Sequence, residues 1–290
     1  MKAKLYKLPF PPNTSFLYRN LDRNHIEDPW HFHKEYELLL INKGNGTRFV
    51  GDNVSLFESG DLTLIGSDIP HLFRNDKEYY VRSNNLTVNL IYIHFRKDFL
   101  GENFFDIPEM KMVNGLLEKA SLALEIHGNA KKEIIKRLIA MNNEKPEERL
   151  MSLLHVLIKL SNSRSVKPIS STRFVAKSTD DNVKINLAFE FILKNYTEQI
   201  YVNEIALKLN MSVSAFSRYF KQHTRKTFSD YVTELRISHA CKLLMDDNHS
   251  ISQISFLSGF ENLSNFYRHF KKIIGVVPKE YRNQFLKISE

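Results

Sequence analysis

Two short segments near the C-terminus carry the same arrangement of aromatic and basic residues. Residues 216–221 (FSRYFK) are echoed fifty positions later by residues 266–271 (FYRHFK). In each copy two Phe lie four residues apart and share one helical face, whereas the Arg lies about 200° around the helix from the first Phe. An exposed Arg and Lys on a short helix held by two aromatic side chains are the chemistry that a reader of the DNA major groove needs.

Each basic segment is expected to be the second helix of a helix-turn-helix unit. Ser212 and Asn262 precede the two segments and are residue types that favour helix N-caps. Hydrophobic spacing predicts the partner helices at 202–209 and 251–258, and a connecting helix over 228–246. A helix of about 18 residues spans roughly 27 Å, close to the roughly 34 Å between successive major grooves on one DNA face. One monomer is therefore predicted to reach two adjacent grooves.

Composition excludes several classes of protein. The formal net charge is +8, with +4 in residues 181–290 and +4 in residues 1–180, so total charge alone is weak support for nucleic-acid binding. Cys241 is the only cysteine, which excludes an internal disulfide, and its helical setting predicts a buried thiol. No signal peptide and no apolar run of membrane-spanning length is present. These features predict a soluble, cytoplasmic protein with no membrane partner.

The N-terminal half has the pattern of a small β domain. Residues 1–20 are expected to form an arm. Short apolar or alternating runs, separated by Gly, Asn and Asp turns, then indicate an antiparallel barrel or sandwich over about residues 25–100. The predicted strands are 36–41, 47–50, 54–57, 62–65 and 86–95.

Helical spacing replaces this pattern over about residues 109–163. The three apolar stripes are Met112, Leu116, Leu117, Ala120 and Leu124; Ile134, Ile135, Leu138 and Ile139; and Leu150, Leu153, Leu154, Leu157 and Ile158. The third stripe is wide enough to pack on the β domain and also to meet a helix of a second chain, which predicts a homodimer. The alternative is a stripe that is wholly buried within one chain.

The predicted fold class is therefore α+β with two domains. Residues 1–165 form the β domain with its appended helices, and residues 183–290 form an all-helical domain. Residues 166–182, rich in Ser, Thr, Lys and Asp with few aliphatic side chains, are expected to be the linker between them.

The C-terminal domain closely resembles the DNA-binding domain of AraC/XylS-type transcription regulators over about residues 183–286. In the second unit the resemblance rests on residues 251–260 (ISQISFLSGF) and 266–272 (FYRHFKK), with Gly275, Pro278, Tyr281 and Arg282. In the first unit it rests on Ile205, Ala206, Leu209, Met211, Ser212, the 216–221 segment, Arg236, Ala240, Leu243 and Leu244. One departure is Arg225, where the family usually has Gly after the first reading helix. Arg225 is a candidate phosphate contact.

The resemblance implies that the helices at 212–223 and 263–273 read double-stranded DNA. The outward-facing candidates are Ser214, Ser217, Arg218, Lys221 and Gln222 on the first helix, and Ser264, Asn265, Tyr267, Arg268 and Lys271 on the second. Arg reads guanine edges, Asn prefers adenine, and Lys mostly meets phosphate. RNA polymerase is a further candidate partner.

The N-terminal domain resembles a cupin, the effector-binding type of domain found in AraC-type regulators. His31, His33, Glu37 and Gly44 match the first cupin motif, although His25 stands at its opening Gly. Gly60, Asp61, Pro70, His71 and Asn75 match the second, although Gly66 and Asp68 depart from it. All four usual ligand positions are filled: His31, His33, Glu37 and His71. This ligand set suits Fe, Mn, Ni, Cu or Zn.

The resemblance leaves three uses for this pocket. The favoured one is binding of a small polar effector such as a sugar at His31, His33, Glu37 and His71, with no cofactor required. The second adds a divalent transition metal on the same four residues that assists effector binding. The third is a metal-dependent cupin enzyme. Trp30, Tyr36, Tyr92 and His94 are further candidates for the pocket wall.

The predicted function is a sequence-specific transcription regulator that senses a small molecule. No nucleotide-binding loop and no Ser/His/Asp arrangement is present, and no catalytic residues are predicted. A regulator without an effector, whose N-terminal domain serves only for dimerisation, is the remaining alternative.

Overall fold

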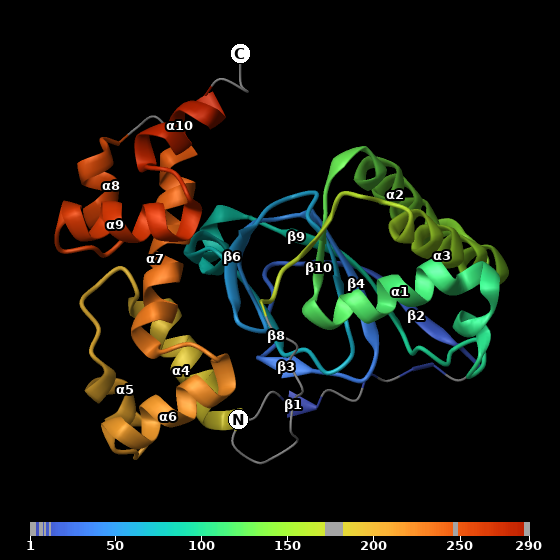
Figure 1. The fold of residues 1–290 in the computed structure, drawn as a ribbon, viewed down its shortest axis with the longest axis horizontal. Coiled ribbons are helices and arrows are strands. Elements are labelled where there is room, and N and C mark those ends of the chain that lie inside the picture. The colour runs from blue at the N-terminus through green and yellow to red at the C-terminus, as the bar shows by residue number, and fades with distance from the viewer. Residues whose placement is uncertain are drawn as a thin grey trace. The chain divides into compact units, whose positions relative to one another are not determined.

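The structure, a computed structural model, describes residues 4–5, 8, 10–11, 13–171, 182–245 and 249–286. Most of them fall into two compact units, one within residues 3–179 and the other within residues 180–290. The first holds the β-sheets with three longer helices, and the second holds only helices, so the predicted α+β class with two domains is confirmed (Figure 1). Within the described ranges, no helix is both long and apolar enough to cross a bilayer.

The N-terminal domain contains two sheets of antiparallel strands, apart from the parallel pairing of the short strands β1 (Lys4–Leu5) and β3 (His31–Phe32). In spatial order, one sheet consists of β1, β3, β8 (His71–Asn75), β5 (Gly46–Val50) and β6 (Asn53–Phe57). The other consists of β11 (Val166–Pro168), β10 (Leu124–Ile126), β7 (Leu62–Ile65), β4 (Tyr36–Lys43), β9 (Val88–Phe95) and β2 (Phe16–Arg23). Strands β4, β5, β6, β7 and β9 lie within a few residues of the predicted ones.

Alternation along the strands gives the second sheet two differently used faces. Leu38 and Leu40 of β4, with Ile91 and Ile93 of β9, are buried in a core shared with helices, whereas Leu39 belongs to the core on the opposite face. That opposite core also contains residues of the first sheet, such as Val50 and Phe73. The domain is therefore a pair of facing sheets with helices packed on the outer face of one of them.

The helices on that outer face are α1 (Lys111–Lys119), α2 (Gly128–Ala140) and α3 (Pro146–Ser161). They bury Leu116, Leu138 and Leu157 against the sheet core, as predicted, whereas Met112 and Ile139 of the predicted stripes are 59% and 41% exposed. Short 3-10 turns complete the domain: η1 (Lys77–Tyr80), η2 (Arg82–Asn84), η3 (Phe104–Asp106), η4 (Pro108–Met110), η5 (Ala120–Leu122) and η6 (Met141–Asn143).

Three boundaries expected from the sequence are wrong. The last part of the expected arm, residues 16–20, belongs to strand β2 (Phe16–Arg23), which pairs along its whole length with β9. Leu124, assigned to a helical stripe, lies in β10. The expected linker begins too early, because Val166–Pro168 forms β11 and pairs with β10. The domain extends at least to Ser171, whose backbone N–H donates to Asp52 at 2.9 Å. Residues 172–181 of the expected linker lie outside the described residues.

The C-terminal domain is all-helical, as predicted. Its helices are α4 (Asn182–Asn195), α5 (Val202–Lys208), α6 (Val213–Thr224), α7 (Phe228–Met245), α8 (Ile251–Leu257), α9 (Leu263–Ile274) and α10 (Pro278–Leu286). The pairs α5–α6 and α8–α9 are the two predicted helix-turn-helix units, and α7 connects them (Figure 1).

Helix α7 is buried on more than one side because each helix-turn-helix unit packs on a different part of it. Near its start, Phe228 and Tyr231 contact the ring of Phe220 from α6. Further along, Ile237 and Cys241 join a core that contains Phe266 and Phe270 of α9. Burial raises the pKa of the Cys241 thiol to about 12, so Cys241 is the buried, unreactive thiol that was predicted.

The two reading helices end differently. Helix α6 closes on Arg225 at φ +60°, and α9 closes on Gly275 at φ +90°, each with its N–H donating to the carbonyl four residues earlier. A non-glycine residue in this left-handed region costs about 1 kcal/mol. We expect Arg225→Gly to raise the free energy of unfolding by about that amount, measured by thermal unfolding.

Gly275→Ala is the matched control for this prediction. A Cβ at Gly275 would meet no atom within 4 Å, so that substitution reports backbone strain alone and should destabilise. A destabilising Arg225→Gly would show that the Arg225 side chain contributes more than its backbone costs. If Arg225 contacts phosphate, the glycine variant should also bind all DNA sequences more weakly.

Candidate functional site

The four polar residues predicted to share a pocket come together in the N-terminal domain. His31 lies in β3, Glu37 in β4 and His71 at the start of β8, and one ligand atom from each, with one from His33, lies within 4.8 Å of all the others. Strand β3 ends at Phe32, so the four residues do not share one regular strand. They converge because the chain bends between β3 and β4, which belong to the two facing sheets.

The three imidazoles are held in one orientation by the backbone. Their Nδ1 atoms lie 2.7–2.9 Å from carbonyl oxygens two residues away in the sequence, at Pro29 for His31, Glu35 for His33 and Ile69 for His71. A carbonyl oxygen only accepts, so each Nδ1 carries the hydrogen. In neutral His31 and His71, Nε2 therefore presents a lone pair, which is the arrangement found in metal-binding histidines, whereas Nε2 of His33 faces the Glu37 carboxylate at 3.3 Å.

Glu37 is the centre of this cluster. Its Oε2 lies 2.6 Å from Nε2 of His94, 3.3 Å from Nε2 of His33 and 3.8 Å from Nε2 of His71. Burial alone would raise the pKa of Glu37, but the imidazoles of His71 and His94 and the hydrogen bond from His33 hold that pKa well below its usual range. Glu37 is therefore an ionised carboxylate in a buried site.

His31 is neutral for the opposite reason. Burial, together with the neighbouring imidazoles of His71 and His33, lowers the pKa of His31 well below its ordinary value of 6.5. The cluster thus combines one negative charge with imidazole lone pairs, and a cation or hydrogen-bond donors would complete it.

The lowered pKa of His31 predicts how the metal-free protein responds to acid. Below about pH 6.5 the unfolded chain takes up a proton at His31, whereas the folded domain does not, so stability present above that pH is lost as the pH falls. We expect a slope of at most about 1.4 kcal/mol per pH unit. Unfolding between pH 5 and 8 in EDTA should show this slope, and His31→Gln should flatten it. An unchanged slope in the variant would contradict the assignment.

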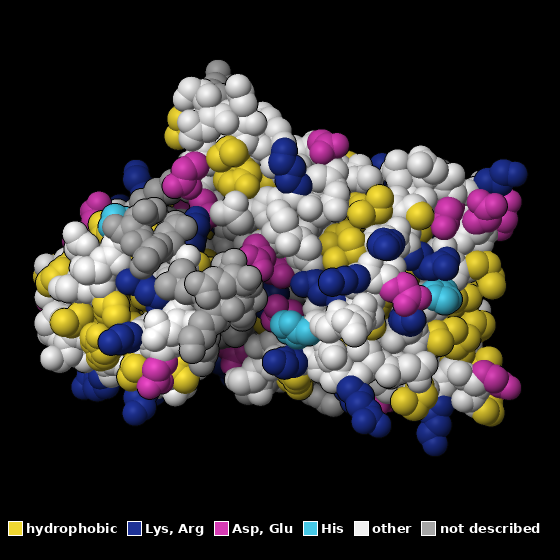
Figure 2. Space-filling model, turned by 90° about the horizontal axis from the view of Figure 1, so that it is seen from above, with side chains coloured by type: hydrophobic (Ala, Val, Ile, Leu, Met, Phe, Trp, Pro, Cys, Tyr) yellow, Lys and Arg dark blue, Asp and Glu magenta, His cyan; other side chains and the backbone are white. Residues whose placement is uncertain are grey.

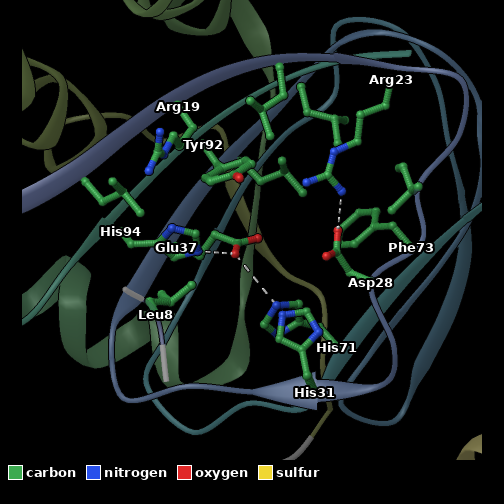
Figure 3. A pocket seen from close by; sticks show the side chains of 15 residues that line it. Leu8, Arg19, Arg23, Asp28, His31, Glu37, His71, Phe73, Tyr92 and His94 are labelled. Atoms are coloured by element: carbon green, nitrogen blue, oxygen red, sulfur yellow. Dashed lines mark hydrogen bonds and ion pairs between the residues drawn. The ribbon is translucent and has the colours of Figure 1, made fainter. Parts of the chain in front are cut away.

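A cavity of about 330 Å³ opens beside the cluster (Figure 3). Its wall includes His31, Glu37 and His71, and also Tyr92 and His94, as predicted. Its remaining lining residues are Leu8, Leu17, Arg19, Leu21, Arg23, Ile26, Asp28, Leu39, Phe73 and Leu90.

Three of the expected pocket residues do not line this cavity. His33 belongs to the cluster but not to the cavity wall. Trp30 is 1% exposed within the core, and Tyr36 stacks on Phe95 with ring centroids 5.4 Å apart. Arg19 and Arg23, which do line it, were missed because Arg19 was assigned to the arm and Arg23 to no element. No period-2 alternation marks their strand, because Leu17, Arg19, Leu21 and Arg23 share one face and mix apolar with charged side chains.

The two predicted reading helices have the expected caps. Ser212 Oγ accepts from the backbone N–H of Ala215 at 3.2 Å, and Asn262 Oδ1 accepts from that of Asn265 at 2.7 Å. Most of the predicted DNA contacts are exposed: Ser214, Ser217, Arg218, Lys221, Gln222, Ser264, Arg268 and Lys271.

Two positions on α9 differ from the predicted outward set. Tyr267 is half-buried and packs against the second helix-turn-helix core, so it does not point fully outward. Asn265 is also half-buried, and its Oδ1 accepts from Nη2 of Arg268 at 2.6 Å. In the free protein Asn265 therefore orients the Arg268 side chain.

One face of the molecule shows how the charged side chains are distributed there. On the face drawn in Figure 2, Lys and Arg side chains are interspersed with Asp and Glu and form no single continuous patch. Residues 181–290 carry the same net charge, +4, as the longer segment 1–180, so total charge is weak support and the placement of Arg and Lys on α6 and α9 is the stronger signal.

Comparisons with known proteins cover both domains. Residues 14–158 match the family model of an AraC-like ligand binding domain, and residues 205–284 match that of a helix-turn-helix domain. The HTH-type transcriptional activator RhaR of Mannheimia succiniciproducens is 23% identical over 92% of this chain and 92% of its own length. The melibiose operon regulatory protein of Escherichia coli K12 is 33% identical over 92 residues, 32% of this chain and 30% of its own.

Among solved structures, the C-terminal domain of the two-component response regulator yesN from Fusobacterium nucleatum is 31% identical. The matched region covers 35% of this chain and 99% of the yesN domain, with a TM-score of 0.33. The two family models follow one another in the order of the two structural domains, the first over the facing sheets and α1–α3, the second over the paired helices. The chain therefore belongs to the AraC family of DNA-binding transcription regulators, with an AraC-like ligand binding domain followed by a helix-turn-helix domain.

Proposed function

We propose that this regulator binds its DNA target through α6 and α9 and that a small polar molecule in the N-terminal cavity controls this binding. The observation that carries the proposal is the convergence of His31, His33, Glu37 and His71 beside a cavity of about 330 Å³ in the ligand binding domain. That volume lies at the lower end of the range for small-molecule sites.

The need for hydrogen-bond partners supports a polar effector. Nε2 of His71 and Nδ1 of His94 are buried and have no hydrogen-bond partner among the described residues. Buried polar groups of this kind are costly unless a ligand, water or metal satisfies them. A sugar is the first class to test, because one relative is named for the melibiose operon.

The effector proposal is tested with a metabolite library on the full-length protein. We expect at least one polar metabolite to raise the melting temperature and to change affinity for selected DNA, and a His31→Ala/His71→Ala variant to lose both responses. His155→Ala, on the exposed side of α3, is the matched control. No response to any metabolite, together with normal regulation by the double variant, would refute the proposal.

A divalent transition metal fits the same residues. We propose that Nε2 of His31, His33 and His71 and the Glu37 carboxylate would hold it, since all three Nδ1 atoms are already bonded to the backbone. The metal would supply a Lewis acid for oxygen atoms of the effector. This chain's own residues orient the ligands, and His94 fixes the carboxylate through its 2.6 Å hydrogen bond.

We propose a binding role for the domain rather than catalysis. The alternative is a metal-dependent cupin enzyme that shares the chain with a DNA-binding domain. Turnover assays on metal-loaded protein with any metabolite that binds distinguish the two, because a sensor returns its ligand unchanged.

We also propose a homodimer built on α2 and α3. Leu153 and Leu157 are buried within the domain, but Ile158 is 41% exposed, Met151 65% and Ile139 of α2 41%. An apolar edge therefore remains beside the buried stripe. Since β11 belongs to the domain, sedimentation should use residues 1–171 rather than 1–165. A strictly monomeric fragment at high concentration would exclude this dimer.

RNA polymerase stays a candidate partner of the DNA-bound regulator.

A further inference from the structure

The charged side chains that line the cavity, Arg19, Arg23, Asp28 and Glu37, are equal in number of each sign but are not all paired. The Glu37 carboxylate is bonded to His94 at 2.6 Å, and Asp28 lies 3.4 Å from Nη1 of Arg23. Arg19 lines the same cavity and has no hydrogen-bond or ion-pair partner in the part of the chain that the structure describes. Both acidic groups thus have partners inside the protein, whereas one guanidinium is left over.

The second guanidinium is only partly engaged. Arg23 makes a single long contact to Asp28, which leaves most of its N–H groups available. Arg19 and Arg23 lie on the same face of β2, four residues apart, so their Cα atoms are roughly 13 Å apart. Figure 3 shows both on one wall of the cavity, with Tyr92 between them. Long side chains on such a wall can close on one small anionic group.

Two histidine nitrogens at the cavity lack hydrogen-bond donors, one on β9, the strand beside β2, and one on the facing sheet. Nε2 of His94 lies 2.6 Å from the ionised Glu37 and carries the hydrogen, so Nδ1 of His94 presents a lone pair. That atom is buried and has no partner among the described residues, and the same holds for Nε2 of His71. His94 is 3% exposed and His71 1%, so bulk water does not satisfy these acceptors.

We propose that the effector is anionic as well as hydroxylated: a molecule of monosaccharide size whose acid group binds Arg19 and Arg23 and whose hydroxyls donate to His71 and His94. Guanidinium groups bind carboxylates and phosphates through paired, charge-assisted hydrogen bonds. Hydroxyls are the donors that the buried nitrogens lack. The inference rests on the effector site proposed above and names the chemical class of its ligand.

The test is calorimetric titration of the full-length protein with matched probes. Each set contains a neutral aldose, its uronate and its 6-phosphate, in the glucose, galactose and mannose series. We expect an acidic member to bind at least tenfold more tightly than its neutral counterpart, and Arg19→Gln to weaken the acid by about 10- to 100-fold while leaving the neutral sugar unchanged. Arg164→Gln removes one exposed guanidinium elsewhere on the domain and should change neither.

The outcomes separate this inference from the effector site itself. Within one sugar series, tighter binding of the uronate than of the aldose 6-phosphate identifies a carboxylate as the acid group, and the reverse identifies a phosphate. If a neutral sugar binds as tightly as its acid, or if the preference for the acid survives in Arg19→Gln, the inference is wrong while the effector site stands. If no probe binds in any series, the ligand class proposed here is wrong, and the metabolite screen with the His31→Ala/His71→Ala variant decides the effector site separately.

Discussion

An Arg218→Ala/Arg268→Ala double variant is expected to lose nearly all preference for its target DNA. Each Arg is exposed on a capped helix, and loss of one bidentate contact to a base costs about 1–3 kcal/mol. The two residues lie on separate helix-turn-helix units and should act additively, which gives about 2–6 kcal/mol, or roughly 30-fold to 10⁴-fold in affinity. Fluorescence anisotropy with DNA selected by the wild-type protein measures this loss.

Two controls separate base reading from general electrostatics. Lys271→Ala should weaken binding to all sequences similarly and reduce the salt dependence, because Lys on such a helix mostly meets phosphate. Lys194→Ala removes an exposed charge from α4 and should leave specificity unchanged. Asn265→Ala should act in the same direction as Arg268→Ala but less strongly, because Asn265 orients that side chain in the free protein. Unchanged binding in the double Arg variant would end the assignment of α6 and α9 as readers.

The second large effect is expected at the metal site. Protein purified without chelator should contain about one transition metal per chain, and His33→Ala should lose it. Removal of a partner that only orients a ligand typically weakens metal binding by about 10- to 100-fold. His94→Gln, which disturbs the bond to Glu37, should fall in that range, and His33→Ala should exceed it. Elemental analysis and competition with a chromogenic chelator measure both.

His155→Ala is the control for the metal experiment, because it removes an exposed imidazole on α3, outside the cluster. A wild-type protein that takes up no transition metal, even when grown with a metal supplement, would remove the metal proposal. It would leave the effector site in place, since hydroxyl donors could satisfy the same nitrogen atoms. Equal metal content in His33→Ala and the wild type would show that the metal binds elsewhere.

Much of this architecture could be predicted from local patterns. The strands from β4 to β7 and β9 are bounded by Gly, Asn and Asp turns, and the helix-turn-helix units carry N-caps and paired aromatics, so local signals and tertiary structure agree. Strand β2 was missed because it is an edge strand with polar residues on both faces, Arg19 and Arg23 on one and Asn20 and Asp22 on the other. Its pairing with β9 is a long-range contact that no local pattern reports.

The site was predictable in type but not in geometry. The motif resemblance named His31, His33, Glu37 and His71, and these residues do converge. Their convergence depends on a bend after β3 and on the two sheets facing each other. The spacing of residues along one strand predicts neither feature. Arg19 entered the site only through the pairing of β2 with β9, which also brings Tyr92 beside it.

The central claim is that a small molecule in the N-terminal cavity controls sequence-specific DNA binding. Selection of bound DNA fragments by the full-length protein, with and without a metabolite library that includes sugars and sugar acids, tests it most directly. We expect the selected DNA to have two conserved elements. Arg218→Ala should lose the preference for one element and Arg268→Ala the preference for the other. It also predicts that at least one metabolite shifts this binding in the wild type and not in His31→Ala/His71→Ala. No enriched sequence, or an enriched sequence whose binding no metabolite changes, would contradict it.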